Sequence, residues 1–178
     1  RQTAGKRLHD WLASIPRACT TMPVMPEAHA SALPASVLGF DFGTKRIGMA
    51  FGQRITGTAQ VLQVIDQGQT GPDWIRIEHA LRDWRPEALV VGLPLTLDGG
   101  EQTTAQLARR FAHALGERYA LPVHLVDERM TSIEAARRFA AARSAGQRRK
   151  LDARLLDSFA AQVIVENFLA QPAPRSPT

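Results

Sequence analysis

Three strand-like segments near the start of the folded region lie so close together that only tight turns can join them. Residues 37–42 form a continuous apolar run, as in a buried central strand. A Gly-Thr turn follows, residues 46–51 resume as a second strand, and residues 58–65 alternate as a third. Because strands joined by short turns pair antiparallel, this region predicts a three-stranded meander.

Helices and strands alternate along the rest of the chain. The predicted elements are a helix from Asp73 to Trp84, a strand over 88–91, a helix over 103–119, a strand over 123–126, and helices over 131–142 and 152–169. The order is therefore β-β-β-α-β-α-β-α-α. Since the later strands must add in parallel by right-handed crossovers, we expect an α/β fold with a mixed five-stranded sheet flanked by helices.

Proline marks the limits of this domain. Of the eleven prolines among 178 residues, seven fall in the 44 residues of 1–36 and 171–178. Neither segment shows sustained apolar periodicity. We expect residues 1–36 to be a flexible extension, residues 37–170 to be the folded domain, and residues 171–178 to be a tail.

Composition excludes several classes of protein. No apolar run approaches the roughly 20 residues that a membrane span needs. The single cysteine, Cys19, excludes an internal disulfide and a multi-cysteine zinc site. The five histidines never fall three to five residues apart, so a helical zinc motif is also excluded. These features predict a cytoplasmic protein that does not enter the membrane.

The positive charge is concentrated in one stretch. The chain carries 22 Lys and Arg against 17 Asp and Glu, a net charge of +5. Residues 137–154 contain seven bases and one acid, or +6, which leaves −1 for the remainder. Such asymmetry favours a polyanionic partner, although a solvated helix face would show the same pattern.

Three acidic positions interrupt apolar segments. Asp41 lies between Phe40 and Phe42 in the first strand, where an ionised carboxylate needs either a turn to cap or a cation to hold. Asp127 and Glu128 end the last strand, and alternation sends them to opposite faces, so that one can face a site while the other caps the next helix.

The last helix supplies the third acid. Asp157 shares the apolar stripe of this helix with residues three, four and seven positions further on, whereas Asp152 lies at the helix start as a natural N-cap. Acids that converge from three elements would provide hard oxygen ligands for Mg²⁺ or Mn²⁺. Two such ions can support phosphodiester hydrolysis, and nucleic acid is the phosphodiester that a basic stretch would recruit.

Five ordered motifs resemble those of a known family. In chain order they are Gly39-Phe-Asp-Phe-Gly-Thr-Lys-Arg-Ile-Gly48, Gly52-Gln-Arg-Ile-Thr-Gly-Thr58, Val91-Gly-Leu-Pro-Leu95 with Asp98-Gly99, Asp127-Glu-Arg129, and Leu156-Asp-Ser-Phe-Ala-Ala161. They resemble the YqgF/RuvX family of Holliday junction resolvase-like nucleases, associated in bacteria with maturation of the 5′ end of pre-16S rRNA. The resemblance covers about residues 37–170.

The resemblance implies an RNase H-like fold and a metal-dependent nuclease that uses Mg²⁺ or Mn²⁺. Its catalytic and metal-binding acids would be Asp41, Glu128 and Asp157. Its substrate would be precursor rRNA or branched DNA. The expected nucleic-acid contacts are Lys45, Arg46, Arg129, Arg148, Arg149 and Lys150.

Other readings stay open at this point. Residues 41–44 also resemble the phosphate-binding turn of actin-like ATPases and sugar kinases, but those proteins need two such lobes and this chain has residues for one. A domain that binds RNA and cuts little or not at all would not need all three acids. A resolvase acting on branched DNA is the alternative within the same reaction class. Because aromatic and basic residues do not interleave, we expect contacts to backbone and shape.

Overall fold

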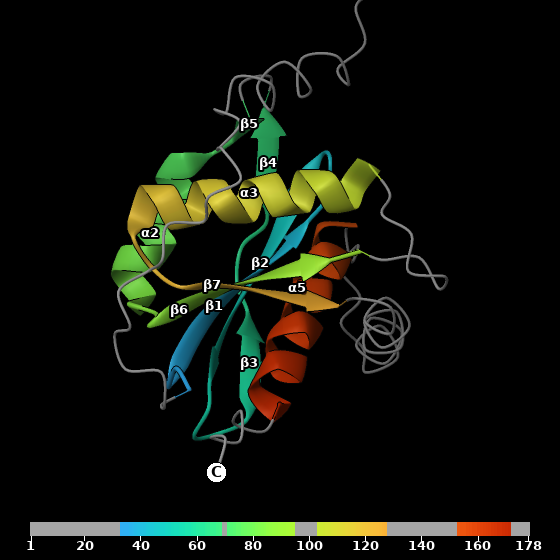
Figure 1. The fold of residues 1–178 in the computed structure, drawn as a ribbon. Coiled ribbons are helices and arrows are strands. Elements are labelled where there is room, and N and C mark those ends of the chain that lie inside the picture. The colour runs from blue at the N-terminus through green and yellow to red at the C-terminus, as the bar shows by residue number, and fades with distance from the viewer. Residues whose placement is uncertain (1–32, 69–70, 95–102, 128–152, 172–178) are drawn as a thin grey trace, which may run out of the picture.

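The protein folds into a mixed sheet with helices on both faces. The computed structural model describes residues 33–68, 71–94, 103–127 and 153–171. Its strands are β1 (Ser36–Phe42), β2 (Arg46–Gln53), β3 (Thr58–Val61), β4 (Ile65–Gly68), β5 (Gly71–Pro72), β6 (Ala88–Leu93) and β7 (Val123–Asp127). Its helices are α2 (Trp74–Trp84), α3 (Thr103–Tyr119) and α5 (Ala153–Ala170) (Figure 1). This is the predicted α/β architecture.

The sheet combines an antiparallel half with a parallel half. The strand order is β5-β4-β2-β1-β6-β7, and β3 also pairs with β2. β1 and β2 pair antiparallel, whereas β1, β6 and β7 run parallel to one another. The meander and the parallel crossovers predicted from the sequence are both confirmed. β1 lies between the two halves, which places its end at the centre of the sheet.

One predicted strand is divided in two. We expected a continuous strand over 58–65, but β3 and β4 pair with different parts of β2. Ala50 pairs with Val61 in β3, and Ile47 pairs with Ile65 in β4. An advance of three residues along β2 is therefore matched by an advance of four residues from β3 to β4. The extra residue is a bulge between β3 and β4. With the short β5, the described part of the sheet has seven strands where five were expected.

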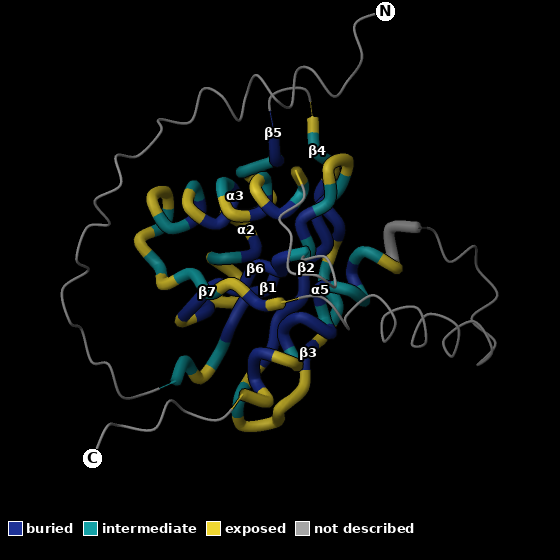
Figure 2. Tube along the Cα trace, turned by 45° about the vertical axis from the view of Figure 1, so that its right-hand side comes forward, coloured by how far each residue is buried: buried dark blue, intermediate teal, exposed yellow. Residues whose placement is uncertain are grey.

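Alternation along the strands separates two cores. Leu38, Phe40 and Phe42 of β1 join the cluster formed with α2 and α3. Val37 belongs to the second cluster, which α5 covers. Both clusters are buried (Figure 2). Since side chains alternate along a strand, Asp41 lies on the α5 face of the sheet.

Helix α2 follows its sequence signals. The Asp73 side chain accepts a hydrogen bond from the backbone N–H of Arg76 at 3.3 Å, which makes Asp73 the predicted N-cap. Arg85 ends the helix in the left-handed conformation, with φ of 45°. Helix α3 also has the predicted bounds, residues 103–119. The helix predicted over 131–142 lies outside the described residues.

Polar side chains of α5 fix this helix against β3. Gln162 Nε2 donates to the carbonyl of Ala59 at 2.6 Å, and Glu166 Oε1 accepts from the Ala59 N–H at 3.3 Å. Ser158 is buried and donates through Oγ to the carbonyl of Leu62, in the bulge, at 3.2 Å. Spacing of four residues puts Ser158, Gln162 and Glu166 on one helical face. Because these hydrogen bonds fix α5 against β3 and the bulge, they also fix the backbone of Asp157, the neighbour of Ser158.

Arg54 stabilises the other end of α5. Its Nη1 donates to the carbonyl of Leu169 at 3.0 Å, and its Nε donates to the carbonyl of Pro34 at 3.2 Å. Its guanidinium carbon also lies 5.8 Å from the ring centre of Phe168. The last turn of α5 contains no basic residue, so Arg54 supplies the cation that a helix C-terminus favours.

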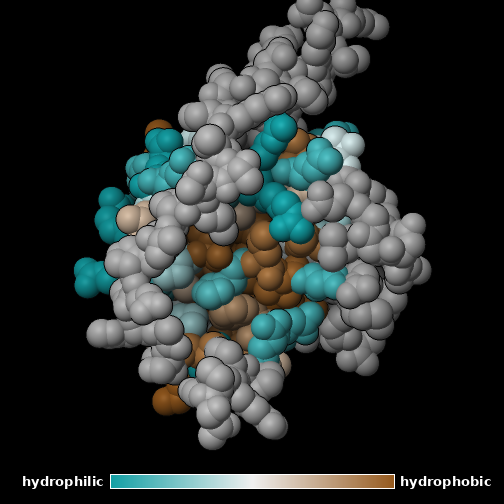
Figure 3. Space-filling model, in the orientation of Figure 1, coloured by the Kyte–Doolittle hydropathy of each residue, from teal (hydrophilic) through white to brown (hydrophobic). Residues whose placement is uncertain are grey.

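Some apolar side chains remain exposed at the surface. On the face seen in Figure 3, they gather near the centre, where Figure 1 places β6, β7 and α5. Leu125 of β7 and Leu156 of α5 are 40% and 37% exposed. Among the described residues, no helix is long and apolar enough to cross a membrane.

Candidate active site

The site is built around Asp41, at the end of the central strand. Phe40 and Phe42 on either side of it point into the core below α2 and α3. Asp41 itself lies on the α5 face and is half-buried. The buried side chains of Phe40 and Phe42 therefore hold β1 in the core, and the strand presents the Asp41 carboxyl group on the opposite face.

A close approach of α5 brings Asp157 to the same place. Gly48 of β2 lies directly opposite Asp41 in the β1–β2 register. A Cβ on Gly48 would overlap the backbone carbonyl of Asp157. Only glycine leaves room for a helix backbone to pack so tightly on a strand. Asp157 is therefore adjacent to Asp41, although the two acids lie 116 positions apart in the chain.

The two carboxyl groups interact electrostatically. Burial, and after it the neighbouring charge of Asp157, raises the pKa of Asp41 from its ordinary 3.8 to about 7. Both causes act by penalising the ionised form. The Asp41 carboxyl group therefore stays protonated up to near-neutral pH, unless a bound cation replaces the proton. An acid whose pKa is raised by burial and by the charge of a second acid is typical of a functional site.

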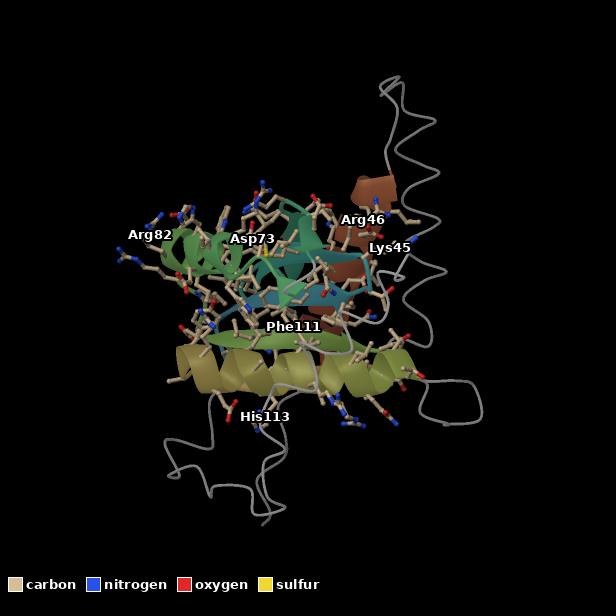
Figure 4. All side chains as sticks on the ribbon, turned by 90° about the horizontal axis from the view of Figure 1, so that it is seen from above. Lys45, Arg46, Asp73, Arg82, Phe111 and His113 are labelled. Atoms are coloured by element: carbon tan, nitrogen blue, oxygen red, sulfur yellow. The ribbon has the colours of Figure 1, made fainter. Side chains whose placement is uncertain are left out.

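Arg46 supplies one positive charge to this pair. Its Nε lies 3.0 Å from Oδ2 of Asp157, and the two side chains are 29% and 26% exposed. Its neighbour Lys45 is exposed in the β1–β2 turn. Figure 4 shows both basic residues beside α5, while Arg82 lies at the far side of the molecule on α2. Two of the predicted nucleic-acid contacts thus lie next to the acid pair.

The β1–β2 turn is held by Gln67 of β4, a residue that the sequence did not single out. Its backbone N–H donates to the carbonyl of Lys45 at 2.9 Å. Its side-chain Nε2 donates to the carbonyl of Gly43. Gly43 N–H also donates to the carbonyl of Arg46 at 3.0 Å, which closes the turn. The bulge before β4 shifts the pairing of β4 with β2 by one residue. This shift places Gln67 beside the β1–β2 turn.

Register separates Asp127 from the acid pair. Asp127 lies beside Leu93 in the parallel β6–β7 pairing, and Leu93 belongs to the core under α2 and α3. Asp127 is therefore on the opposite face of the sheet from Asp41. The remaining predicted residues lie outside the described residues; they are Glu128, Arg129, Arg148, Arg149, Lys150 and the alternative ligand Asp152.

The donor set of the site fits a divalent cation. In the described ranges, no group of three or more His, Cys, Asp or Glu side chains gathers as a complete metal site. Asp41 and Asp157 form a pair of hard oxygen donors, the type that Mg²⁺ and Mn²⁺ prefer. Burial and, after it, the charge of Asp157 raise the pKa of Asp41, and a bound cation would relieve both penalties on the ionised carboxylate.

The sheet order, the helix on each side and the acids on β1 and α5 define the RNase H-like class of fold. T. thermophilus RuvC in complex with a Holliday junction substrate has a similar fold, with a TM-score of 0.50 and 17% sequence identity. That match covers 79% of this chain and 99% of the RuvC chain. The predicted fold is therefore confirmed.

Sequence comparison identifies the family. The model of the RuvX family, described as a Holliday junction resolvase, matches residues 35–171. A protein of Xanthomonas axonopodis pv. citri (strain 306), named "Putative pre-16S rRNA nuclease", is 50% identical over 148 residues, which are 83% of this chain and 96% of that protein. A protein of the same name from Xanthomonas oryzae pv. oryzae (strain PXO99A) matches with the same identity and coverage. The chain belongs to the RuvX family, as its motifs predicted.

Proposed function

We propose that this protein is a metal-dependent nuclease that hydrolyses phosphodiester bonds at the 5′ end of pre-16S rRNA during ribosome biogenesis. The observation that carries the proposal is the pairing of Asp41 with Asp157 on one face of the sheet, with the pKa of Asp41 raised to about 7. The names of the relatives that are 50% identical support the rRNA substrate. This function would place the protein in the cytoplasm.

Each acid has a distinct position in the proposed centre. Asp41 comes from the central strand and Asp157 from the first turns of α5, so rigid elements hold both. Glu128 is the proposed third ligand, since its neighbour Asp127 lies on the other face. When bound, one or two Mg²⁺ or Mn²⁺ ions would activate water and neutralise the leaving oxygen. The two-ion arrangement is the form that we propose.

Basic residues next to the acids would position the substrate. Arg46 lies against Asp157, and Lys45 is exposed in the same turn. Arg129 would add a base beside Glu128, and the run 148–150 would extend the contact along the nucleic acid. Cations at these places bind phosphates without reading sequence, so recognition would depend on backbone and shape.

A resolvase acting on branched DNA is the second candidate. The family description and the similar fold of RuvC favour it. A domain that binds RNA without cutting is a third reading, and the acid pair argues against it. Binding alone does not need a second carboxylate that raises the pKa of Asp41.

One cleavage experiment separates the three candidates. The protein is incubated with Mg²⁺ or Mn²⁺ and either a pre-16S rRNA leader fragment or a four-way DNA junction. We expect metal-dependent cleavage of the RNA, and its loss in Asp41→Asn. Cleavage of the junction alone would favour the resolvase. Tight RNA binding with equal, negligible cutting by both proteins would refute the nuclease.

A further inference from the structure

Arg46 and Asp157 form an ion pair between two segments whose backbones are held in place. The Arg46 backbone is fixed, because its carbonyl accepts from Gly43 N–H and β4 pairs with the start of β2 at Arg46. The Asp157 backbone is fixed by its contact with Gly48 and by the hydrogen bond of the adjacent Ser158. Since the arginine side chain has more rotatable bonds than that of aspartate, Arg46 is the partner that can swing away when this 3.0 Å contact breaks.

That carboxylate is also needed by the proposed metal centre. A guanidinium 3.0 Å from Oδ2 covers one of the two oxygens that Asp157 could offer to a cation. A divalent ion beside Asp157 would repel the guanidinium, and the repulsion is strong because both side chains are about one quarter exposed and poorly screened. Arg46 and the metal are therefore competitors for Asp157.

Displacement would leave Arg46 where a substrate phosphate is expected. The side chain is anchored at the start of β2, next to the turn that carries Lys45, so that it remains within reach of the acid pair. A guanidinium is well suited to phosphate, because its planar donors match the phosphate oxygens. The same residue can thus neutralise Asp157 before the metal binds and contact phosphate afterwards.

We propose that Arg46 holds the Asp157 carboxylate in the metal-free protein, and that metal binding releases Arg46 to the substrate phosphate. The proposal rests on the proposed metal-dependent nuclease and adds an order of events to it. In the absence of metal, the ion pair offsets part of the negative charge of Asp157. Metal binding and substrate binding are then coupled through one side chain.

The test measures metal affinity by calorimetric titration of Mn²⁺ into the chelator-treated, full-length protein at about pH 8, where Asp41 has largely lost its proton. Removing the competing cation in Arg46→Gln should tighten Mn²⁺ binding about tenfold, within the usual range of coupling between two ligands. Lys45→Gln is the matched control: it removes one positive charge from the same turn, but among the described residues Lys45 has no ion pair. We expect less than about a threefold change for it.

Thermal unfolding gives a second readout that does not depend on cleavage. Arg46→Gln should melt below the unsubstituted protein without metal, because it lacks the ion pair. At saturating Mn²⁺ the difference should close, since the pair is then broken in both proteins. Unchanged or weaker Mn²⁺ binding, or a melting difference that metal leaves unaltered, would overturn the proposal while the nuclease function stands. Failure of the unsubstituted protein to bind Mn²⁺ would refute the metal centre itself.

Discussion

Replacement of Asp41 by Asn should make the metal-free protein more stable while it destroys cleavage. In the unfolded chain the Asp41 carboxyl loses its proton near pH 3.8, whereas in the folded protein it does so near pH 7. Between these values the folded state binds more protons, so stability falls as the pH rises. Above about pH 7 the folded protein carries the full penalty of an ionised Asp41. Asn cannot ionise and avoids it.

The size of the effect follows from the two pKa values. The difference between 3.8 and about 7 corresponds to about 4 kcal/mol, at 1.36 kcal/mol for each pH unit. The side chain is half-buried, and water screens part of this penalty, so we expect about 2 kcal/mol at about pH 8. At about pH 3.5 both side chains are neutral, and the two proteins should have similar stability.

Urea unfolding in the presence of a chelator, repeated across this pH range, measures the prediction. Asp83→Asn is a matched control, because Asp83 is exposed and its ion pair with Arg82 is long, at 3.6 Å. That control should change the free energy of unfolding by less than about 0.5 kcal/mol at each pH. A loss of stability in Asp41→Asn at about pH 8, or a gain that does not vary with pH, would refute the reasoning.

Three further substitutions test how the site is positioned. Gly48→Ala places a methyl group where the Asp157 carbonyl lies, so we expect it to destabilise the protein by about 3 kcal/mol and to abolish cleavage. A melting temperature like that of the unsubstituted protein would contradict the close approach of α5 to β2. Gln67→Leu removes the side-chain bond to Gly43 and should lower stability by about 1 kcal/mol and reduce the cleavage rate, whereas an unchanged rate would show that the turn needs no such support. Arg54→Leu removes the cation from the end of α5 and should lower the free energy of unfolding by about 1–2 kcal/mol, with an unaffected urea midpoint as the contrary result.

The fold was largely predictable from the sequence because its signals are local. Each signal depends on neighbouring residues: the run at 37–42, the cap at Asp73 and the periodicity of the later elements. The structure confirms the first two, and it confirms those later elements that lie in the described ranges. The divided third strand was not predictable in the same way. The bulge depends on how the residues of β3 and β4 pair with those of β2. This pairing is set by tertiary packing and not by neighbouring residues in the chain.

The acidic residues of the site were predictable from the sequence, but the contacts that position them were not. Asp41 and Asp157 stood out because an acid in an apolar pattern needs a partner. The Arg46–Asp157 contact and the role of Gln67 depend on packing between distant segments. Gly48 did carry a sequence signal, since a glycine within a strand often marks a close approach of another backbone. Glu128 stays a prediction.

The central claim is that Asp41 and Asp157 together bind a divalent metal ion. Anomalous diffraction from crystals soaked in Mn²⁺ tests it most directly, since the signal locates manganese independently of activity. The account predicts a manganese peak at the Asp41 and Asp157 carboxyl groups, and no peak there in Asp41→Asn. Manganese bound elsewhere, or no manganese with Arg46 still seated on Asp157, would contradict it.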